Sequence, residues 1–298
     1  MGVIISAIGQ GIIWSLLGIG LYLSFRILNF PDMTVEGTFP LGAAVSVTLV
    51  TQGVNPVLAI IIAGIIGGVA GLITGLLYTK GQIPILLAGI LTMTATYSIN
   101  LRIMGQANKS LLGVKTLFNN QFVNWLPDNF PTIGVGIVIV IVIVASVAWF
   151  LQTELGQAFI ATGDNQTMAW ALGINSDAMV TLGLIISNAL IALGGALVAQ
   201  NNGFADVNMG IGIIVVALAS IIIGEVVYTD KLTLTERLIT VVIGSILYRF
   251  VLVAVLAFGF DANDLNLFSA VILGLALLLP KFRHSLNIAK LFPQKGAK

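Results

Sequence analysis

Long uninterrupted runs of apolar residues constrain this chain more than any other feature. Of its 298 residues, 58% are hydrophobic and only 8% carry a charge. A soluble domain carries about 25% charged residues, so this chain lacks the side chains to cover a water-facing surface. Crossing the hydrocarbon core of a bilayer takes about 20 apolar residues. The sequence therefore predicts an all-α integral membrane protein and excludes a soluble globular domain or a disordered chain.

Charged residues and turn-forming clusters divide the chain into about eight or nine candidate membrane spans. The predicted spans cover residues 3–25, two short crossings within 37–79 separated at 52–56, then 81–101, 129–153, 178–205, 207–224, 234–258 and 265–279. Pro280 is expected to end the last of them. Since no low-complexity linker interrupts the series, we expect one transmembrane domain over residues 1–298.

The distribution of basic residues predicts which side of the membrane each end faces. The tail after residue 280 carries Lys and Arg but no acid. Because cytoplasmic segments are enriched in Lys and Arg, we place the C-terminus inside the cell. Counting back through the spans puts the N-terminus outside and makes residues 102–131 an external loop. The expected location is the cell membrane, plasma or inner, with multiple passes.

Several classes of function lack the residues that they need. The chain has no cysteine and a single histidine, His284, and it contains no G-x-x-x-x-G-K-[ST] motif. We therefore expect no nucleotide site, no metal, no cofactor and no catalytic residue. A net charge of +1 offers no electrostatic footprint for nucleic acid. Glu225 and Arg249 lie in or beside spans, and each is either structural or part of a gate or pathway.

Residues 26–42 are too polar and too rich in proline for an ordinary span. Pro31 and Pro40 each lack a backbone donor and restrict the preceding residue, so the segment is not predicted to be continuous helix. Non-helical backbone near a membrane is buried in protein or lines a watery cavity. The alternative is an interfacial loop. The candidate translocation-path residues here are Asn29, Phe30, Thr34 and Glu36.

A second polar run lies within the fourth predicted span. Its hydroxyls either line a path or bond to their own helix backbone, as hydroxyls in membrane helices commonly do. The candidate path residues in this run are Thr92, Thr94, Thr96, Tyr97 and Asn100. One span earlier, Gly67, Gly71 and Gly75 form a stripe of small residues. That stripe predicts close packing within the bundle, with a dimer contact as the alternative.

The stretch of residues 153–177 predicts one short helix. Asp164 or Asn165 can cap its start and Gly173 can end it, which brackets residues 166–172. A helix of two turns is unstable alone in water. It therefore rests on a partner protein, on its own spans or on the lipid interface. Its apolar residues are Met168, Trp170, Ala171 and Leu172.

Taken together, these stretches resemble the membrane permease subunits of ABC importers in the branched-chain amino-acid and ribose permease family. Residues 28–43 look like that family's N-F-x-x-G-x-F element followed by L-G-A, with a few extra residues. The insertion at 31–36 is similar to a branch associated with tryptophan or tyrosine uptake. The family's cytoplasmic loop, ending in G-I-N, is matched in register by Gly156, Ala158, Ala161, Ala169, Gly173, Ile174 and Asn175. The loop departs from the family pattern because it has no Arg.

The resemblance implies a non-catalytic subunit of an importer for a small solute, with an amino acid, and an aromatic one in particular, favoured. It implies two permease copies around a shared path, a pair of ATP-binding subunits beneath, and an extracytoplasmic substrate-binding protein. The short helix in the cytoplasmic coupling loop, 153–177, would sit in a cleft of the ATPase. The residues implied in coupling are Gly156, Ala161, Gly163, Asn165, Met168, Ala169, Trp170, Leu172, Gly173 and Ile174.

Two other functions remain open at this point. A stand-alone secondary carrier or channel would need intramembrane carboxylates or broken helices that hold an ion, and Glu225 is the strongest candidate. An intramembrane enzyme would need a nucleophile system or a cluster of acids that the sequence does not contain.

Overall fold

The computed structural model describes residues 2–119, 130–227, 232–261 and 264–285. The long helices are α1 (Gly2–Leu21), α2 (Val35–Thr51), α3 (Pro56–Thr79), α4 (Ile85–Met104), α5 (Phe130–Gln152), α8 (Ser176–Asn202), α9 (Ile213–Val227), α10 (Leu234–Ala257) and α11 (Leu265–Ser285). The shorter elements are η1 (Tyr22–Ile27), β1 (Asn108–Ser110), α6 (Glu154–Asp164), α7 (Gln166–Ala171), β2 (Phe204–Asp206) and η2 (Val207–Gly210).

Membrane-crossing helices dominate the fold, as the sequence predicts. Within the described residues, 7 helices are long and apolar enough to cross a membrane. Two shorter apolar helices, Val35–Thr51 and Leu265–Leu278, add to them. The all-α membrane architecture with about eight or nine spans is therefore confirmed.

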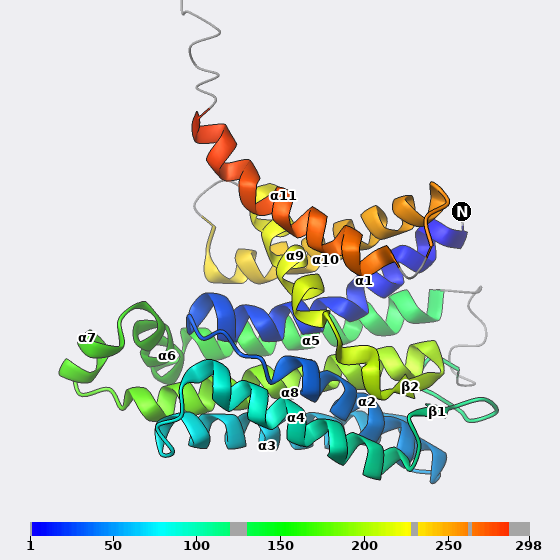
Figure 1. The fold of residues 1–298 in the computed structure, drawn as a ribbon, viewed down its shortest axis with the longest axis horizontal. Helices are drawn as coiled ribbons and strands as arrows, with labels where there is room; N and C mark the ends of the chain where they lie inside the picture. The colour runs from blue at the N-terminus through cyan, green and yellow to red at the C-terminus, as the bar shows by residue number, and fades with distance from the viewer. Residues whose placement is uncertain (1, 120–129, 228–231, 262–263, 286–298) are drawn as a thin grey trace, which may run out of the picture.

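Helix α8 lies at the centre of the bundle and packs against α1, α2 and α3 (Figure 1). Small residues on α3 allow this approach. A Cβ at Gly71 would collide with the carbonyl oxygen of Leu184, and a Cβ at Gly67 would collide with Ala192. Close backbone approach through small residues is how helices associate in lipid. The glycine stripe of α3 therefore packs against its own bundle.

The two ends of the bundle carry different elements. Helices α6 and α7 lie at one end, and strands β1 and β2 lie at the opposite end (Figure 1). The strands are antiparallel, with Asn108 opposite Asp206. The start of α1 lies toward the strand end. We call these the α7 end and the strand end.

Between α1 and α2 the chain leaves helical geometry over residues 28–34, and α1 reaches this break through the π-helical turn η1. The prediction that residues 26–42 are not continuous helix is therefore confirmed; the break covers residues 28–34, and helix resumes at Val35 and continues through Pro40. Pro40 leaves the carbonyl oxygen of Glu36 without its helical donor. Gly210 packs against that oxygen, at a point where a Cβ would collide with it.

The predicted coupling loop contains two helices where the sequence predicts one. Helix α6 begins at Glu154, and the Thr153 hydroxyl accepts the Gly156 N–H at 3.2 Å. Helix α7 is capped by Asn165, whose side chain accepts the Met168 N–H at 2.9 Å. Gly173 has φ +84° and ends the motif, as its position predicts.

The structure also differs from the sequence prediction near the C-terminus. Helix α11 continues past Pro280 to Ser285, so the prediction that Pro280 ends the last span is wrong. A proline removes one helical hydrogen bond, and the residues on either side keep theirs. Residues 120–129 of the predicted external loop and residues 286–298 of the basic tail lie outside the described residues.

Candidate functional site

Helix α7 presents three large apolar side chains to the surroundings. Met168 is 60% exposed, Trp170 74% and Leu172 68%. Ala169, between them, is buried at 1% and therefore belongs to the interior of this chain. An exposed apolar cluster on a two-turn helix outside the spans is typical of a protein interaction surface. We call Met168, Trp170 and Leu172 the α7 tip.

The other predicted coupling residues hold the α7 tip in place. A Cβ at Gly156 would collide with the carbonyl oxygen of Phe150, and Ala161 is partly buried on the same helix, α6. Asn165 caps α7, and Gly173 follows it with positive φ. The Ile174 N–H bonds the carbonyl oxygen of Ala169 at 3.0 Å, which closes the turn.

Gly163 joins α6 to the break between α1 and α2. A Cβ at Gly163 would collide with the carbonyl oxygen of Ile27 and with Leu28, where η1 ends. Phe159, from the same face of α6, packs against Gly183 of α8, as does Leu28. Helix α6, which directly precedes α7, therefore packs on the start of the non-helical segment and on the central helix.

A buried polar network holds the non-helical segment. One oxygen of Asp32 accepts the Thr34 N–H at 2.9 Å, and the other accepts Nδ2 of Asn188 at 2.7 Å. Oδ1 of Asn188 in turn accepts the Thr38 hydroxyl at 2.7 Å. Burial raises the pKa of the Asp32 carboxyl above its ordinary value, and the hydrogen bonds from Thr34 and Asn188 oppose that rise only in part.

Hydroxyl groups extend this network across two further helices. Thr34 bonds Thr74 of α3 at 2.8 Å, and Thr74 bonds Thr92 of α4 at 2.9 Å. All three threonines are buried. The network therefore connects the start of α2 to α3, α4 and α8.

The predicted path residues separate into a buried set and an accessible set. Thr96 and Asn100 face α2: a Cβ at Gly37 would collide with the Thr96 hydroxyl, and Nδ2 of Asn100 lies 3.4 Å from the Gly37 carbonyl oxygen. Phe30 is also buried and packs edge-on against Tyr78 at 5.3 Å. Together with Thr34 and Thr92, these side chains hold helices together.

The accessible set can meet a solute. Tyr97 is 47% exposed, and Thr94 lies on the same exposed side of α4, with its hydroxyl bonded to the carbonyl oxygen of Ile90. Glu36 is partly buried and accepts the Gly212 N–H at 3.1 Å. Asn29 is exposed, with φ 55°.

Asp32 and Asn188 are residues that the sequence analysis did not select. Each is a polar side chain within or beside an apolar stretch, which is the signal that marks functional positions in membrane proteins. Their partnership is invisible in the sequence because 156 positions separate them. In the described ranges, no group of three or more His, Asp or Glu residues could hold a metal ion.

The two charged residues selected near spans have different surroundings. Glu225 pairs with Arg26. The guanidinium carbon of Arg249 lies 4.0 Å from the centroid of the Trp14 ring, and its Nε is buried without a hydrogen-bond partner. A cation–π contact contributes about 0.5–2 kcal/mol, whereas an arginine at the centre of a span costs about 2.5 kcal/mol or more. The aromatic contact alone does not offset that cost.

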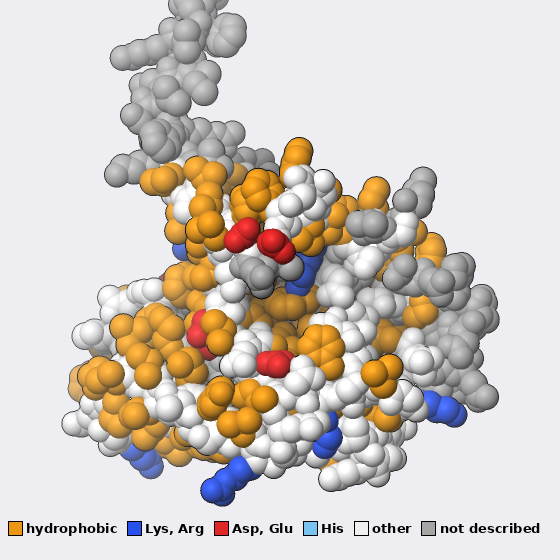
Figure 2. All heavy atoms as spheres, turned by 45° about the vertical axis from the view of Figure 1, so that its right-hand side comes forward, with side chains coloured by type: hydrophobic (Ala, Val, Ile, Leu, Met, Phe, Trp, Pro, Cys, Tyr) orange, Lys and Arg blue, Asp and Glu red, His pale blue; other side chains and the backbone are white. Residues whose placement is uncertain are grey.

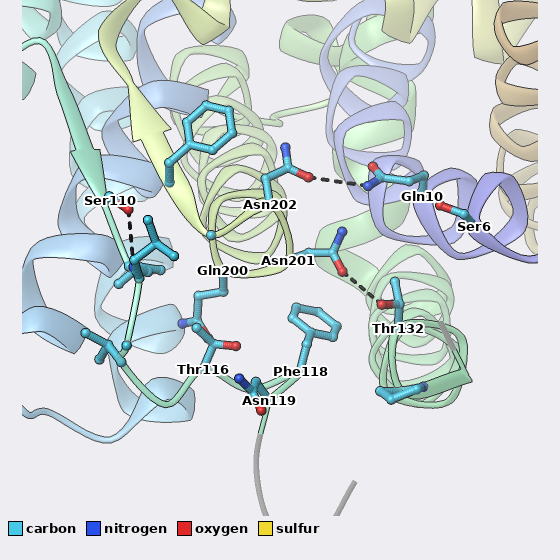
Figure 3. Close-up of a pocket in the computed structure, with 17 residues that line it drawn as sticks. Ser6, Gln10, Ser110, Thr116, Phe118, Asn119, Thr132, Gln200, Asn201 and Asn202 are labelled. Atoms are coloured by element: carbon cyan, nitrogen blue, oxygen red, sulfur yellow. Dashed lines mark hydrogen bonds between the residues drawn. The ribbon is translucent and has the colours of Figure 1, made fainter. Parts of the chain in front are cut away.

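A cavity of about 840 Å³ opens at the strand end (Figure 3). Its polar lining includes Gln10, Asn201 and Asn202, and Asn202 accepts a hydrogen bond from Gln10 at 3.3 Å. Thr132 bonds Asn201 at 2.9 Å. Amides and hydroxyls dominate this lining, in contrast to the face drawn in Figure 2, where apolar side chains are abundant.

Comparison with known proteins gives the chain a family. A family model described as "branched-chain amino acid transport system / permease component" matches residues 3–279. A tyrosine transport system permease protein of Clostridioides difficile (strain R20291) is 39% identical over 100% of this chain and 99% of the relative. The D-allose transport system permease protein of Escherichia coli (strain K12) is 30% identical over 80% of this chain and 71% of the relative.

A solved structure shows a similar fold. A chain of "PsaBC from Streptococcus pneumoniae in complex with Fab" covers 92% of this chain and 89% of its own length, with a TM-score of 0.50 and 17% sequence identity. Members of the matching family are membrane components that work with ATP-binding and substrate-binding proteins. The chain belongs to the branched-chain amino acid transport system permease family, and it is a multi-pass permease subunit of an ABC importer.

Proposed function

We propose that this permease carries an amino acid, and an aromatic one in particular, into the cell. The observation that carries the proposal is the similarity, over the whole chain, to a relative named as a tyrosine transport permease. A relative named for D-allose is less similar and covers less of the chain. An amino-acid solute also agrees with the amide-lined cavity at the strand end, whose neutral groups bind polar solutes.

The energy for transport comes from separate ATP-binding subunits, and the permease itself is not an enzyme. The α7 tip is the contact: its exposed Met168, Trp170 and Leu172 fit an apolar cleft on an ATPase. Because α6 packs on Ile27 and Leu28, closure of the ATPase pair would move the break between α1 and α2. Such a movement needs only two arrangements of packed helices.

The α7 end faces the cytoplasm, the side on which the basic C-terminal tail is also proposed to lie, and the substrate-binding protein docks at the strand end. Residues 1–298 form one transmembrane domain, and two identical copies enclose the path. Tyr97 and Thr94 of α4, with Glu36 of α2, contribute to the wall of that path, because polar side chains of spanning helices mostly face the protein interior or a water-filled cavity.

Reconstitution tests the proposal. The permease and its ATPase are reconstituted in vesicles, and the binding protein is added on the side opposite the ATPase. Uptake of radiolabelled L-tyrosine is measured with and without ATP on the side of the membrane that the ATPase faces. We expect ATP-dependent accumulation. Uptake driven by an ion gradient without ATP would instead support a stand-alone carrier.

Two substitutions on α7 test the coupling contact. Leu172→Arg should reduce co-purification with the ATPase without changing the thermal stability of the isolated permease, because its side chain is exposed. Ala169→Arg is the matched comparison: it should lower stability as well, because the side chain is buried. Normal ATPase binding by Leu172→Arg would contradict the proposed contact.

A further inference from the structure

Arg249 holds a cation deep in the bundle. Its guanidinium lies on Trp14, which is near the middle of the continuous helix formed by α1 and η1. Contacts of Gly18 with Val241 and of Gly11 with Ile246 show that α10 runs antiparallel to α1. Helical side chains point toward the N-terminus of their helix, so the guanidinium reaches from its own Cα away from the strand end. If the Arg249 side chain extended to the nearer membrane surface, its guanidinium would point toward the strand end instead.

This cation has no counter-charge among the described residues. Within the described ranges, the ion pair is Arg26 with Glu225, and no carboxylate pairs with Arg249. Its Nε is buried and lacks an acceptor, while the residue as a whole is only partly buried and remains accessible on one side. An unpaired charge in a span is costly, so an anion that bound beside the guanidinium would stabilise it.

Hydrogen bonds connect the lining of the cavity at the strand end with Trp14, the residue against which the Arg249 guanidinium lies. Asn202 accepts from Gln10 at 3.3 Å, and Gln10 accepts the indole N–H of Trp14 at 3.2 Å. Gln10 and Asn202 line the cavity, as Figure 3 shows. The described lining contains no charged side chain. The Arg249 guanidinium therefore lies against a residue that is hydrogen-bonded to the cavity lining.

We propose that Arg249, held against Trp14, binds the carboxylate of the amino acid inside the permease. This inference rests on the proposed function. A guanidinium presents a planar set of donors that matches a carboxylate with two parallel hydrogen bonds. The terminal nitrogens of the guanidinium supply two of these donors, and the Trp14 ring fixes the plane in which they point.

Two other anions are alternatives that the experiment separates. A lipid phosphate belongs to the membrane surface, whereas the guanidinium lies beside the middle of the α1–η1 helix. A carboxylate from a second copy would neutralise Arg249 whether or not a solute is present. The amino-acid carboxylate agrees best with the depth of the cation and with its position against Trp14, whose indole bonds to a residue of the cavity lining.

The first test uses the unaltered permease–ATPase complex without binding protein. Equilibrium binding of L-tyrosine is compared with that of L-tyrosinamide, which has the same ring and amino group but no carboxylate. A hydrogen-bonded charge pair predicts that tyrosine binds about tenfold more tightly or better. Equal affinities, or no binding of tyrosine, would overturn the inference.

The second test uses three variants of the complete importer in vesicles. Arg249→Gln should abolish the preference for tyrosine over tyrosinamide and lower tyrosine uptake by about tenfold. Arg249→Lys should retain part of the preference for tyrosine and part of the tyrosine uptake, because lysine keeps the positive charge. Arg102→Gln, at an exposed arginine on α4, is the control and should change neither.

The outcomes distinguish the inference from the proposed function. Failure of the unaltered importer to take up tyrosine would count against the proposed function. If the Arg249→Gln variant keeps normal tyrosine uptake and the same preference for tyrosine over tyrosinamide, the inference about Arg249 is overturned and the proposed function is unaffected. An effect of Arg249→Gln that appears in phosphatidylglycerol vesicles and disappears in phosphatidylcholine vesicles would assign the site to lipid phosphate and also overturn it.

Discussion

Arg26 donates two hydrogen bonds to the carboxylate of Glu225, which lies 199 positions later in the chain. Nε lies 2.8 Å from Oε1, and the second contact is 3.1 Å. The pair connects η1, next to the break before α2, with α9. Both side chains are partly exposed, so the pair contributes about 1 kcal/mol or less to stability. Its main effect is to fix how these two helices meet.

Charge reversal tests this connection. Arg26→Glu should lower the unfolding temperature and the rate of ATP-driven uptake, because two carboxylates would face each other. The double variant Arg26→Glu with Glu225→Arg should recover most of both losses. Thermal unfolding in detergent and vesicle uptake measure the two effects. If the loss in the double variant instead equals the sum of the losses in the two single variants, the two residues act independently.

Gly163 is the point at which α6 meets the end of η1, and it has no room for a side chain. Gly163→Ala should destabilise the permease by about 1–3 kcal/mol through overpacking, because the neighbouring atom is the backbone oxygen of Ile27. Gly134→Ala in α5 is the matched control: no atom lies near its Cβ, and alanine favours helix. Thermal unfolding compares the two. Equal stability of both variants would contradict the packing described here.

The sequence predicts the spans well because apolar length is a local property. Helix α5, for example, runs from Phe130 to Gln152 where the prediction is 129–153. Pro40 inside α2 could not be predicted, because Gly210, far along the chain, packs against the oxygen that the proline leaves free. Helix α6 was missed for a similar reason. Gly156 and Gly163 lower the helix propensity of this segment. The fold nevertheless needs glycine at both positions, because a Cβ there would collide with the carbonyl oxygens of Phe150 and Ile27.

The candidate site shows the same division between local and distant information. Exposure of Met168 and Leu172 follows from helical spacing, and the caps at Asn165 and Gly173 follow from residue type. Burial of Ala169 does not follow, because it depends on how α7 rests on the rest of the chain.

Gly173 ends the α7 motif in the left-handed region, with φ +84°. Gly173→Val should reduce ATP-driven uptake, because a β-branched residue is strained at this φ. Gly173→Asn should retain most of the activity, since asparagine adopts this conformation more readily. Vesicle uptake, with the amount of bound ATPase measured in parallel, provides the comparison. Wild-type transport by the valine variant would show that the turn tolerates another geometry.

Asp32 provides acceptors for two buried donors, the Thr34 N–H and Nδ2 of Asn188. Asp32→Ala leaves both without a partner, and each such group costs about 1–3 kcal/mol. We therefore expect a marked fall in the unfolding temperature of the detergent-purified permease. Thr94→Ala is a control, because the Thr94 side chain is exposed and its hydroxyl bonds only its own helix. A fall no larger than that of the control would contradict the role of the network.

The pH dependence of the same variants tests the state of the carboxyl. Burial raises its pKa in the folded protein, so folding favours the protonated form. The stability that proton binding contributes is fully present below the unfolded value of about 4, and it is lost as pH rises through the raised folded value. Relative to Asp32→Asn, which does not titrate, the unaltered permease should therefore lose stability as pH increases from about 4. A constant difference across that range, measured by thermal unfolding, would mean that burial does not shift this carboxyl.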